Sequence, residues 1–539
     1  MEQNVLNSET HDSRLPPGSG DSPSADCPLQ PWHWRSLPLN HRTGAEIFQA
    51  LYIEPETSMP KSAIATLLES PSSPDSNASL LQRPNAQRPN AQRPNAQRPT
   101  PRYSICAGAP RILNNQSQHW TPKPGTHLST LQILLARSPA PPLPRSPASL
   151  LPTSPPPHLP FHGGWLGWLG YDVAWEIETL PEQNADPLPF PVSFWYEPET
   201  FVILDHLDQT LWLAATNPSD LDTLSHHLTS ILPPQLPTSP PPQLPTSTTL
   251  NFLSNQQDYE EAVRKAKAYI QAGDIFQTNL SLRFSTTTAA PSWLIYRSLQ
   301  QVNPSPFSSY WHTPWGDVVS CSPERLVKVR DRIVETRPIA GTRPRGSTLE
   351  QDLAYEQELT DNRKENAEHI MLVDLERNDL GRVCQWGSVQ VDELLTIESY
   401  SHVMHLVSNV VGTLAPGQTV VDVVRSLFPG GTITGCPKVR CMEIIEELEP
   451  VRRSLFYGSC GYLDQRGMLD LNILIRTLLC ESQPNPTSPC SPRLIWGQVG
   501  AGIVADSQPT HEWIESLNKS KAQLNALTLA NNFVSEAKF

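Results

Sequence analysis

The sequence predicts an α+β protein in which sheets pack under helices. Strand-like and helix-like segments follow one another without the strand–helix–strand alternation that parallel sheets require. Apolar residues recur at helical spacing from Tyr259 to Ile270, and Gly273 then provides a stop. At 539 residues, the chain is also long enough to bury a sizeable core.

The distribution of proline divides the chain. It has 57 prolines, well above the ~5% of an average protein, and repetitive stretches hold most of them. Because these stretches have no apolar face to bury, we expect surface insertions. The predicted organisation is a disordered N-terminus over 1–27, an N-terminal domain over 28–251 with insertions at 82–99, 138–160 and 232–247, a C-terminal domain over 252–531 and a tail over 532–539.

The elements of each domain follow from local patterns. The N-terminal domain has short strand-like runs at 201–207 and 210–216, and an aromatic, glycine-rich stretch at 163–181. The C-terminal domain has, in order, a helix over 257–273, strands within 317–329 and 331–341, long amphipathic segments over 352–381 and 438–448, a strand-like run over 472–480 and a final helix near 510–528.

Charge and cysteine content argue against several classes of protein. The net charge is −14, from 40 Lys and Arg against 54 Asp and Glu, which disfavours nucleic-acid binding through a basic face. The nine cysteines form no CxxC pair, so we expect free thiols in a reducing compartment. The chain has no run of ~18 apolar residues, so no membrane-spanning helix is predicted. The polar N-terminus does not resemble a signal peptide. We therefore expect a cytoplasmic protein.

Two pairs of carboxylates stand out in the C-terminal domain. Glu365 and Glu368 lie three residues apart. Glu512 and Glu515 have the same spacing, and Lys519 follows them by one helical turn. This spacing places each pair on one helix face. Two such faces that converge would form an oxygen-rich cradle for Mg²⁺, although such pairs are also common on solvated helices.

A glycine-rich run over 428–440, FPGGTITGCPKVR, predicts a tight loop that leads into a helix. Backbone N–H groups at such a helix start can meet an anion. The run lacks the GxxxxGK[ST] spacing of a nucleotide P-loop. The residues alone thus indicate an α+β enzyme candidate with an anion pocket, and leave open whether the paired glutamates form a magnesium site or lie on solvated helix faces.

Nine ordered runs carry a family resemblance. They are AGDIFQTNLSLRF (272–284), NPSPF (303–307), SPER (322–325), ETRPIAGTRPRG (335–346), KENAEHIMLVDLERNDLGRV (364–383), SHVMHLVSNV (401–410), FPGGTITGCPKVRCMEIIEELEP (428–450), YGSCGYLD (457–464) and GQVGAGIVADS (497–507). The chain resembles the large subunit of the chorismate-utilising aminases, anthranilate synthase component I and aminodeoxychorismate synthase component I. The resemblance implies a two-sheet β-sandwich flanked by helices, with 252–531 as the chorismate-binding catalytic domain.

The resemblance also implies a magnesium ion that grips the ring carboxylate of chorismate. Carried over to this chain, Glu368 and Glu515 are the direct ligands, while Glu365 and Glu512 act through water. Chorismate is a dianion, and an acidic pocket could hold it only with a bridging cation.

Further site residues follow from the same resemblance. Arg476, Tyr457 and the backbone around Gly500 and Gly502 are expected to hold the enolpyruvyl carboxylate, for which an arginine fork is suited. The remaining expected catalytic residues are Thr432, Lys519, His405, Gln277 and the SPER glutamate, Glu324. Among these, His405 is expected to assist the elimination of pyruvate.

The residue at position 277 predicts whether water or ammonia attacks chorismate. Relatives that add water to chorismate carry a lysine at this position as the base, and glutamine cannot act as that base. Ammonia brings its own lone pair, so an aminase is favoured. The chain shows no GxCxGxQ glutaminase motif, and we expect ammonia to come from a separate glutamine amidotransferase subunit.

The residues that carry the resemblance point to two different products. Aminodeoxychorismate synthases often carry a lysine where this chain has Ala340, and the TLLES run resembles a tryptophan feedback motif with Glu69 and Ser70 in its key places. Both features favour anthranilate synthase. Asn279, the run NPSPF and the run GQVGAGIVADS with Trp513 nearby instead resemble the branch that aminates C4 towards p-aminobenzoate and folate, which is the alternative. Phe307–Ser308 also replaces the Tyr–Met pair that is usual beside bound tryptophan, which argues against feedback inhibition. A catalytically inactive regulatory paralogue is a remote third reading.

Overall fold

The computed structural model describes residues 23–24, 29, 31–54, 60–69, 102–137, 155–230, 250–399, 403–482 and 492–536. The predicted insertions at 82–99 and 232–247 lie outside these residues. Residues 138–154 of the predicted insertion at 138–160 also lie outside them, as do residues 1–22 and Ser70.

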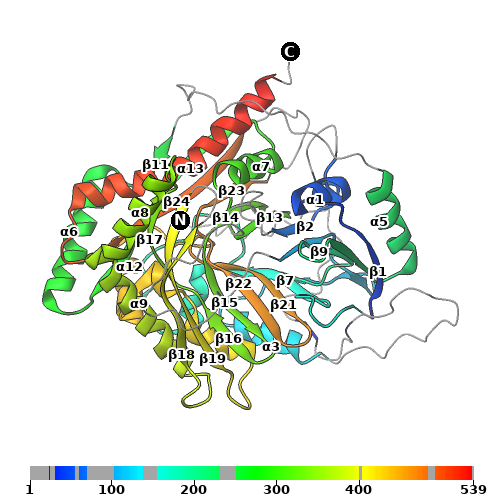
Figure 1. The fold of residues 1–539 in the computed structure, drawn as a ribbon, viewed down its shortest axis with the longest axis horizontal. Helices are drawn as coiled ribbons and strands as arrows, with labels where there is room; N and C mark the ends of the chain where they lie inside the picture. The colour runs from blue at the N-terminus through cyan, green and yellow to red at the C-terminus, as the bar shows by residue number, and fades with distance from the viewer. Residues whose placement is uncertain are drawn as a thin grey trace, which may run out of the picture.

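Two large antiparallel sheets form the centre of the molecule (Figure 1). The first has 12 strands. Its path runs β1 (His33–Pro38), β10 (Thr210–Ala215), β9 (Thr200–Asp205), β3 (Tyr103–Ala107), β2 (Ala65–Glu69), β13 (Phe307–Thr313), β14 (Gly316–Ser322), β23 (Thr477–Glu481), β24 (Arg493–Ile503), β12 (Gln277–Thr288) and β11 (Asn251–Phe252), and β20 (Gly435–Cys436) pairs with β12.

The second sheet has 10 strands. Its path runs β17 (Ile339–Pro344), β19 (Val403–Thr413), β16 (Ile333–Thr336), β15 (Arg325–Arg330), β22 (Met468–Asn472), β21 (Ser459–Asp464), β7 (Gly164–Leu169), β8 (Ser193–Tyr196) and β6 (His119–Trp120), and β18 (Gln390–Ser399) pairs with β19. A short ribbon joins β4 (Ile112–Leu113) to β5 (Gln116–Ser117). Both large sheets contain strands from 28–251 and from 252–531.

Helices cover the outer faces and the two ends (Figure 1). One end carries α1 (Gly44–Tyr52) and α5 (Pro218–Ser230), and the opposite end carries α6 (Gln256–Ala272), α8 (Leu349–Asp361), α9 (Arg363–Gly381) and α12 (Lys438–Leu448). The long α13 (Pro509–Glu536) packs on α7 (Ser292–Val302), α6 and β24. Shorter helices are α3 (His127–Leu135), α4 (Ala174–Ile177), α10 (Val420–Leu427), α11 (Gly431–Thr434) and the 3₁₀ turn η1 (Tyr171–Val173).

Two apolar clusters explain this layering. The first fills the space between the sheets with large aromatic side chains, among them the fully buried Trp165, Trp168 and Trp311. The second lies between the 12-stranded sheet and its helices and contains Phe48 and Val263. Each aromatic side chain buries a large apolar area, so burial of these clusters is the main favourable contribution to folding.

The predicted α+β sandwich flanked by helices is confirmed. The helix expected over 257–273 is α6, and Gly273 ends it with a left-handed φ of 83°. The amphipathic segment 352–381 is two helices rather than one, because Asn362 ends α8 and its side chain caps α9. The final helix extends to Glu536. No helix among the described residues is long and apolar enough to cross a membrane.

Candidate active site

The β24 strand forms the floor of the site. Gly500 and Gly502 lie two residues apart, so their Cα atoms face the same side of the sheet. A Cβ added at Gly500 would lie 2.9 Å from the Tyr457 hydroxyl, and one added at Gly502 would lie 2.6 Å from the Gln277 amide nitrogen. Glycine at both positions therefore lets these two side chains lie directly on the strand.

A basic corner borders this floor. The Lys519 Nζ of α13 donates to the Gly500 carbonyl at 2.9 Å and pairs with Glu515 at 2.9 Å. The Arg476 guanidinium donates to the Lys519 carbonyl at 2.7 Å. Burial lowers the pKa of Arg476, while the neighbouring Tyr457 raises it. A buried cation of this kind is stabilised by an anion that supplies the missing hydrogen bonds.

Backbone strain marks the same corner. Tyr457 and Arg476 both adopt a left-handed φ, of 65° and 52°. Non-glycine residues seldom adopt this conformation, and it is concentrated at binding sites, where the surrounding structure holds it in place. The Arg453 guanidinium lies 4.7 Å from the Tyr457 ring centroid and pairs with Glu449 at 2.6 Å. These contacts fix the tyrosine ring.

His405 faces the site from the second sheet. It lies on β19 opposite Thr342 of β17, and its Nδ1 lies 2.9 Å from the Thr342 hydroxyl. Burial, with a smaller contribution from Arg476, lowers the pKa of His405 to about 4, while a hydrogen bond with the Gly341 backbone and the charge of Glu398 oppose the shift. The imidazole is therefore neutral near pH 7 and able to accept a proton.

Glu324 has the opposite protonation state. Burial raises the pKa of Glu324 to about 8, Thr432 opposes this shift, and Glu376 adds to it. The carboxyl group is therefore largely protonated at pH 7 and able to donate a proton. Thr432 is linked to the floor through its carbonyl, which accepts from the Asn279 side chain at 3.4 Å. A neutral imidazole and a protonated carboxyl are the forms that a general base and a general acid require at neutral pH.

The predicted metal ligands lie on two helices from different layers, with one pair on α9 and the other on α13. Glu368 is half-buried, Glu512 is buried and the Glu515 side chain is 52% exposed. No three of the four glutamates bring ligand atoms within 4.8 Å of one another. The group that meets this distance among the described residues is His158, Asp205 and Asp208, and Arg102 already pairs with both aspartates.

Glu365 carries the feature that best fits a cation. Its Oε1 pairs with Arg343 at 3.1 Å, whereas its buried Oε2 has no hydrogen-bond partner. A Cβ added at Gly341 would lie 2.5 Å from that oxygen. A buried carboxylate oxygen without a donor is the hard ligand that Mg²⁺ prefers. One predicted ligand thus has an oxygen suited to Mg²⁺, while the four glutamates do not converge on one point, so the metal site stays a prediction.

The predicted tryptophan position has a different environment. Glu69 ends β2 and is buried, and its carboxylate accepts from the Ala45 N–H at 3.0 Å, the Tyr296 hydroxyl at 2.9 Å and the Gln300 amide at 2.5 Å. Burial raises the pKa of Glu69, and these donors oppose the shift. Because Ser70 lies outside the described residues, the tryptophan site stays a prediction.

Three residues contribute to the site beyond those predicted for it. Thr342 orients His405, Arg343 orients Glu365, and Asn279 has a buried Oδ1 without a partner beside Gly500. All three lie within the runs ETRPIAGTRPRG and FQTNL, so the signal was present in the sequence. What it lacked was the strand pairing that gives each one a neighbour.

Comparison with known proteins gives the family. Residues 98–525 match the family described as chorismate binding enzyme. The chain is 56% identical to a Synechocystis "anthranilate synthase component I-like protein" over 93% of this chain and 92% of that protein. It is 42% identical to the Synechocystis anthranilate synthase component 1 over 68% of this chain and 76% of that protein. The Bacillus subtilis aminodeoxychorismate synthase component 1 is 44% identical over 69% and 78%.

A solved structure agrees with these relatives. Anthranilate synthase component I from Streptococcus pneumoniae superimposes with a TM-score of 0.63 at 29% identity, covering 83% of this chain and 96% of that one. It shares the arrangement of large antiparallel sheets and flanking helices. The chain therefore belongs to the family of chorismate binding enzymes, in the group that contains anthranilate synthase component I and aminodeoxychorismate synthase component 1.

Proposed function

We propose that the protein aminates chorismate with ammonia in a magnesium-dependent reaction. The observation that carries this proposal is Gln277 on the floor of the site, against Gly502. An amide cannot deprotonate a water molecule, whereas ammonia needs no base before it attacks. The buried Oε1 of Gln277 has no partner, and it offers an acceptor for an N–H of the incoming ammonia.

The basic corner supports binding of a carboxylate. The guanidinium of Arg476, the Tyr457 hydroxyl and the Lys519 ammonium surround Gly500. Together they would hold the enolpyruvyl carboxylate of chorismate by charge-assisted hydrogen bonds. Glu365, Glu368, Glu512 and Glu515 would hold Mg²⁺, which supplies positive charge to the ring carboxylate when it is bound.

Glu324 and His405 suit the proton transfers that the reaction needs. When ammonia attacks C2 of the ring, the C4 hydroxyl takes a proton from Glu324 and leaves as water, and the ammonium group formed at C2 returns a proton to Glu324. His405 then accepts the proton from C2 while the C3–O bond to the enolpyruvyl group breaks. That proton passes to the methylene carbon of the departing enolpyruvate, which becomes pyruvate, and the ring becomes aromatic. The pKa of about 8 for Glu324 and of about 4 for His405 give each group the required form at neutral pH.

We propose anthranilate as the product. Ala340 lies on β17, opposite Leu406, at the position where a lysine would offer a covalent route to C4. Without that nucleophile, direct attack of ammonia at C2 is the shorter chemical route. Elimination of pyruvate then completes the synthesis in the same site.

Aminodeoxychorismate is the second candidate product, and one comparison favours it. The chain is 56% identical to the component I-like protein of Synechocystis but 42% identical to the anthranilate synthase component 1 of the same organism. Because Synechocystis has both proteins, we infer that its component I-like protein makes a product other than anthranilate. The engaged carboxylate of Glu69 points the same way, because feedback by tryptophan belongs to anthranilate synthesis.

One incubation tests both candidates. Purified protein is mixed with chorismate, Mg²⁺ and ammonium chloride at alkaline pH, and the amine is identified by mass spectrometry and fluorescence. We expect anthranilate and pyruvate in equal amounts. A non-aromatic 4-amino product, which becomes p-aminobenzoate only after a lyase is added, would establish the second candidate. Hydroxylated product without amine would overturn amination altogether.

A further inference from the structure

Glu376 is a second buried carboxyl beside the proposed acid Glu324. Both residues are 6% exposed. Glu376 lies on α9, and a Cβ added at Gly431 would lie 3.6 Å from its Oε1. The residue after Gly431 is Thr432, which lowers the pKa of Glu324. The two carboxyls therefore adjoin the same turn of α11.

A β-bulge links the chain after Glu324 to Glu376. The register of β15 against β22 shifts at Leu326, two residues after Glu324, so Leu326 is the extra residue of the bulge. The carbonyl of this buried residue accepts from the Thr336 hydroxyl of β16 at 3.0 Å. The same hydroxyl oxygen lies 3.1 Å from the Glu376 Oε2. One hydroxyl group thus lies between a backbone carbonyl and the carboxyl.

The Thr336 hydroxyl suits both protonation states of Glu376. A hydroxyl has one hydrogen to donate and two lone pairs that accept. When Glu376 is protonated, its O–H donates to Thr336, and Thr336 donates to the Leu326 carbonyl. When Glu376 is ionised, Thr336 turns its hydrogen towards the Oε2 instead. The carboxyl can therefore gain or lose a proton while every heavy atom stays in place.

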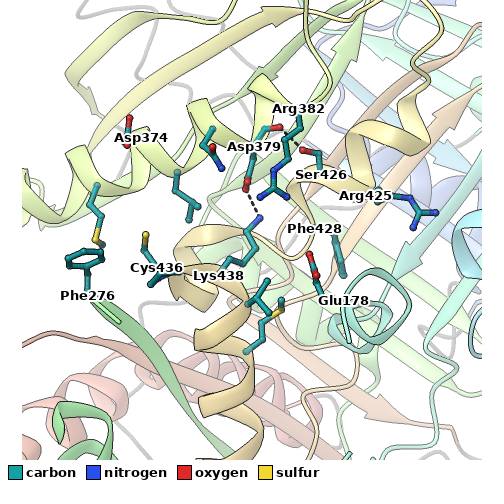
Figure 2. Close-up of a pocket in the computed structure, with 16 residues that line it drawn as sticks. Glu178, Phe276, Asp374, Asp379, Arg382, Arg425, Ser426, Phe428, Cys436 and Lys438 are labelled. Carbon is teal, nitrogen blue, oxygen red and sulfur yellow. Dashed lines mark hydrogen bonds and ion pairs between the residues drawn. The ribbon is translucent and has the colours of Figure 1, made fainter. Parts of the chain in front are cut away.

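A cavity of about 620 Å³ lies behind Gln277 (Figure 2). Phe276, which directly precedes Gln277, and Cys436, the register partner of Gln277, both line this cavity. Its lining includes an ion pair between the Lys438 Nζ and the Asp379 carboxylate, 2.6 Å apart. Figure 2 shows Lys438 reaching from α12 to Asp379 on α9. The cation is therefore held against α9 by a partner on that helix.

This ion pair acts on Glu376. Asp379 follows Glu376 by three residues, so both lie on one face of α9. Burial raises the pKa of Glu376 to about 7. Lys438 opposes this shift, Asp379 adds to it, and the Thr336 hydroxyl opposes it. A cation and a hydroxyl donor therefore favour the ionised form of Glu376.

Glu324 has different surroundings. Burial raises its pKa to about 8. Thr432 lowers this pKa, ionised Glu376 raises it, and the Ile339 N–H lowers it. The positive charge of Lys438 thus acts on Glu376, and the negative charge of Glu376 acts on Glu324. Two buried carboxyls that interact titrate as a pair, and the first to ionise holds the proton on the second.

We propose that Glu376 is a positioning residue that keeps the proton on Glu324. The two carboxyls ionise as a pair, and Lys438 with the Thr336 hydroxyl assigns the first negative charge to Glu376. That charge opposes ionisation of Glu324, so the acid stays protonated at the alkaline pH at which free ammonia is abundant. The inference rests on the proposed function, which makes Glu324 the acid that protonates the leaving hydroxyl.

The test compares the pH dependence of two rates. Full-length wild type and Glu376→Gln are assayed with chorismate, Mg²⁺ and ammonium chloride from pH 6 to 9.5. Both proteins meet the same free ammonia at each pH, so the ratio of their rates is the quantity compared. We expect this ratio to stay within about twofold of one at pH 6 and to fall about tenfold at the alkaline end, because loss of the charge moves the ionisation of Glu324 down by about one pH unit.

A second measurement follows the proton on Glu324 without using activity. Infrared difference spectra between each protein and its Glu324→Gln counterpart show the carbonyl band of protonated Glu324. The infrared midpoint, the pH at which half of this band is lost, should be about one unit lower in Glu376→Gln than in wild type. Glu376→Asp keeps the charge and should restore both quantities towards wild type. If Glu376→Gln does not fold, Glu376→Met removes the same charge and takes its place.

Glu446→Gln is a matched control. Glu446 of α12 is 4% exposed, and its carboxylate accepts from the Gln183 and Asn184 N–H groups, each at 2.8 Å. Replacing this carboxylate by a weaker acceptor should lower the free energy of unfolding. The ratio of the Glu446→Gln rate to the wild-type rate should be the same at every pH, and the infrared midpoint should not move.

Two failures are distinguishable. A Glu376→Gln protein that keeps a constant rate ratio and the wild-type infrared midpoint would overturn the role of Glu376 and leave amination intact. A wild type that forms no amine would overturn the proposed function. The infrared midpoints would then still decide whether Glu376 holds the proton on Glu324.

Discussion

Glu69 and Glu365 are both carboxylates at predicted ligand sites, and their surroundings in the structure differ. Glu69 lies under α7 and has three donors for its two oxygens. Glu365 lies between α9 and β17, where one oxygen pairs with Arg343 and the other has no partner. A buried polar atom without a partner is costly unless a ligand completes it. The hydrogen bonds of the Glu69 carboxylate are therefore complete without a ligand, whereas one oxygen of Glu365 still lacks a partner.

The largest effect is expected at Glu324, a buried carboxyl like Glu69, and it tests whether a buried carboxyl with a raised pKa takes part in catalysis. Glu324→Gln should lower the rate by ~10²–10⁴-fold, the range for loss of a general acid. The wild-type rate should fall above about pH 8, where Glu324 loses its proton, and below about pH 4, where His405 gains one. Rate measurements from pH 4 to 9.5 check this. A variant with a wild-type rate and pH profile would contradict the assignment.

The same group links stability to pH with a defined sign. The pKa of Glu324 is raised to about 8 by burial, whereas the unfolded value is ~4.3. Between these values the native state holds a proton that the unfolded state has released, so this group lowers the free energy of unfolding as pH rises from about 4 to about 8. Unfolding midpoints of Glu324→Gln should depend less on pH over this window. An unchanged pH slope would count against the raised pKa.

Glu365→Gln sharpens the comparison from the catalytic side. The Mg²⁺ concentration for half-maximal rate should rise by ~10–100-fold, the range for loss of an outer-shell partner. The midpoint of denaturant unfolding should change little, because the lost oxygen has no donor to leave unpaired. A Mg²⁺ titration of the rate and a denaturation curve measure the two quantities. A normal rate in EDTA would exclude the metal site.

Glu69→Gln should show the reverse pattern. The amide keeps the shape but turns one acceptor into a donor that faces Ala45, Tyr296 or Gln300. The variant should lose about 1–3 kcal/mol in the free energy of unfolding, while the ammonium-dependent kcat stays near wild type. Denaturant unfolding and a rate assay with ammonium chloride check this. A large loss of activity without loss of stability would place Glu69 in a binding site after all.

Tryptophan provides the mildest test of the comparison. The TLLES run by itself predicts inhibition by tryptophan, whereas the structure leads us to expect no change in rate, because Tyr296 and Gln300 already donate to the Glu69 carboxylate. Inhibition curves with tryptophan and with phenylalanine as a control measure this. Strong inhibition by tryptophan alone would mean that the ligand displaces Gln300.

The sequence was informative where the pattern is local. Helical spacing placed Glu365 with Glu368 on α9 and Glu512 with Glu515 on α13, and Gly273 was correctly predicted as a helix stop. These features depend on neighbours within a few residues, which a sequence shows directly.

Contacts between distant segments could not be predicted. No local pattern pairs Thr342 with His405, because that contact depends on how strands are ordered in a sheet. Only the family resemblance placed Tyr457 near Gly500. The cavity behind Gln277 was missed for the same reason, since its walls come from α9, α10, α12, β20 and the chain segments around Glu178 and Phe276. The break at Asn362 was missed because the helical pattern continues on both sides of it.

The pairing of β7 with β21 has a consequence for how the chain is made. Trp165 in β7 pairs with Leu463 in β21, almost three hundred residues later. During synthesis, β7 can pair with β21 only after most of the chain has been made. Contacts between segments so distant in sequence slow folding. Until then its aromatic face and open edge are exposed to other chains. We expect the N-terminal half to need protection on the ribosome, and a chain released early to aggregate rather than to fold.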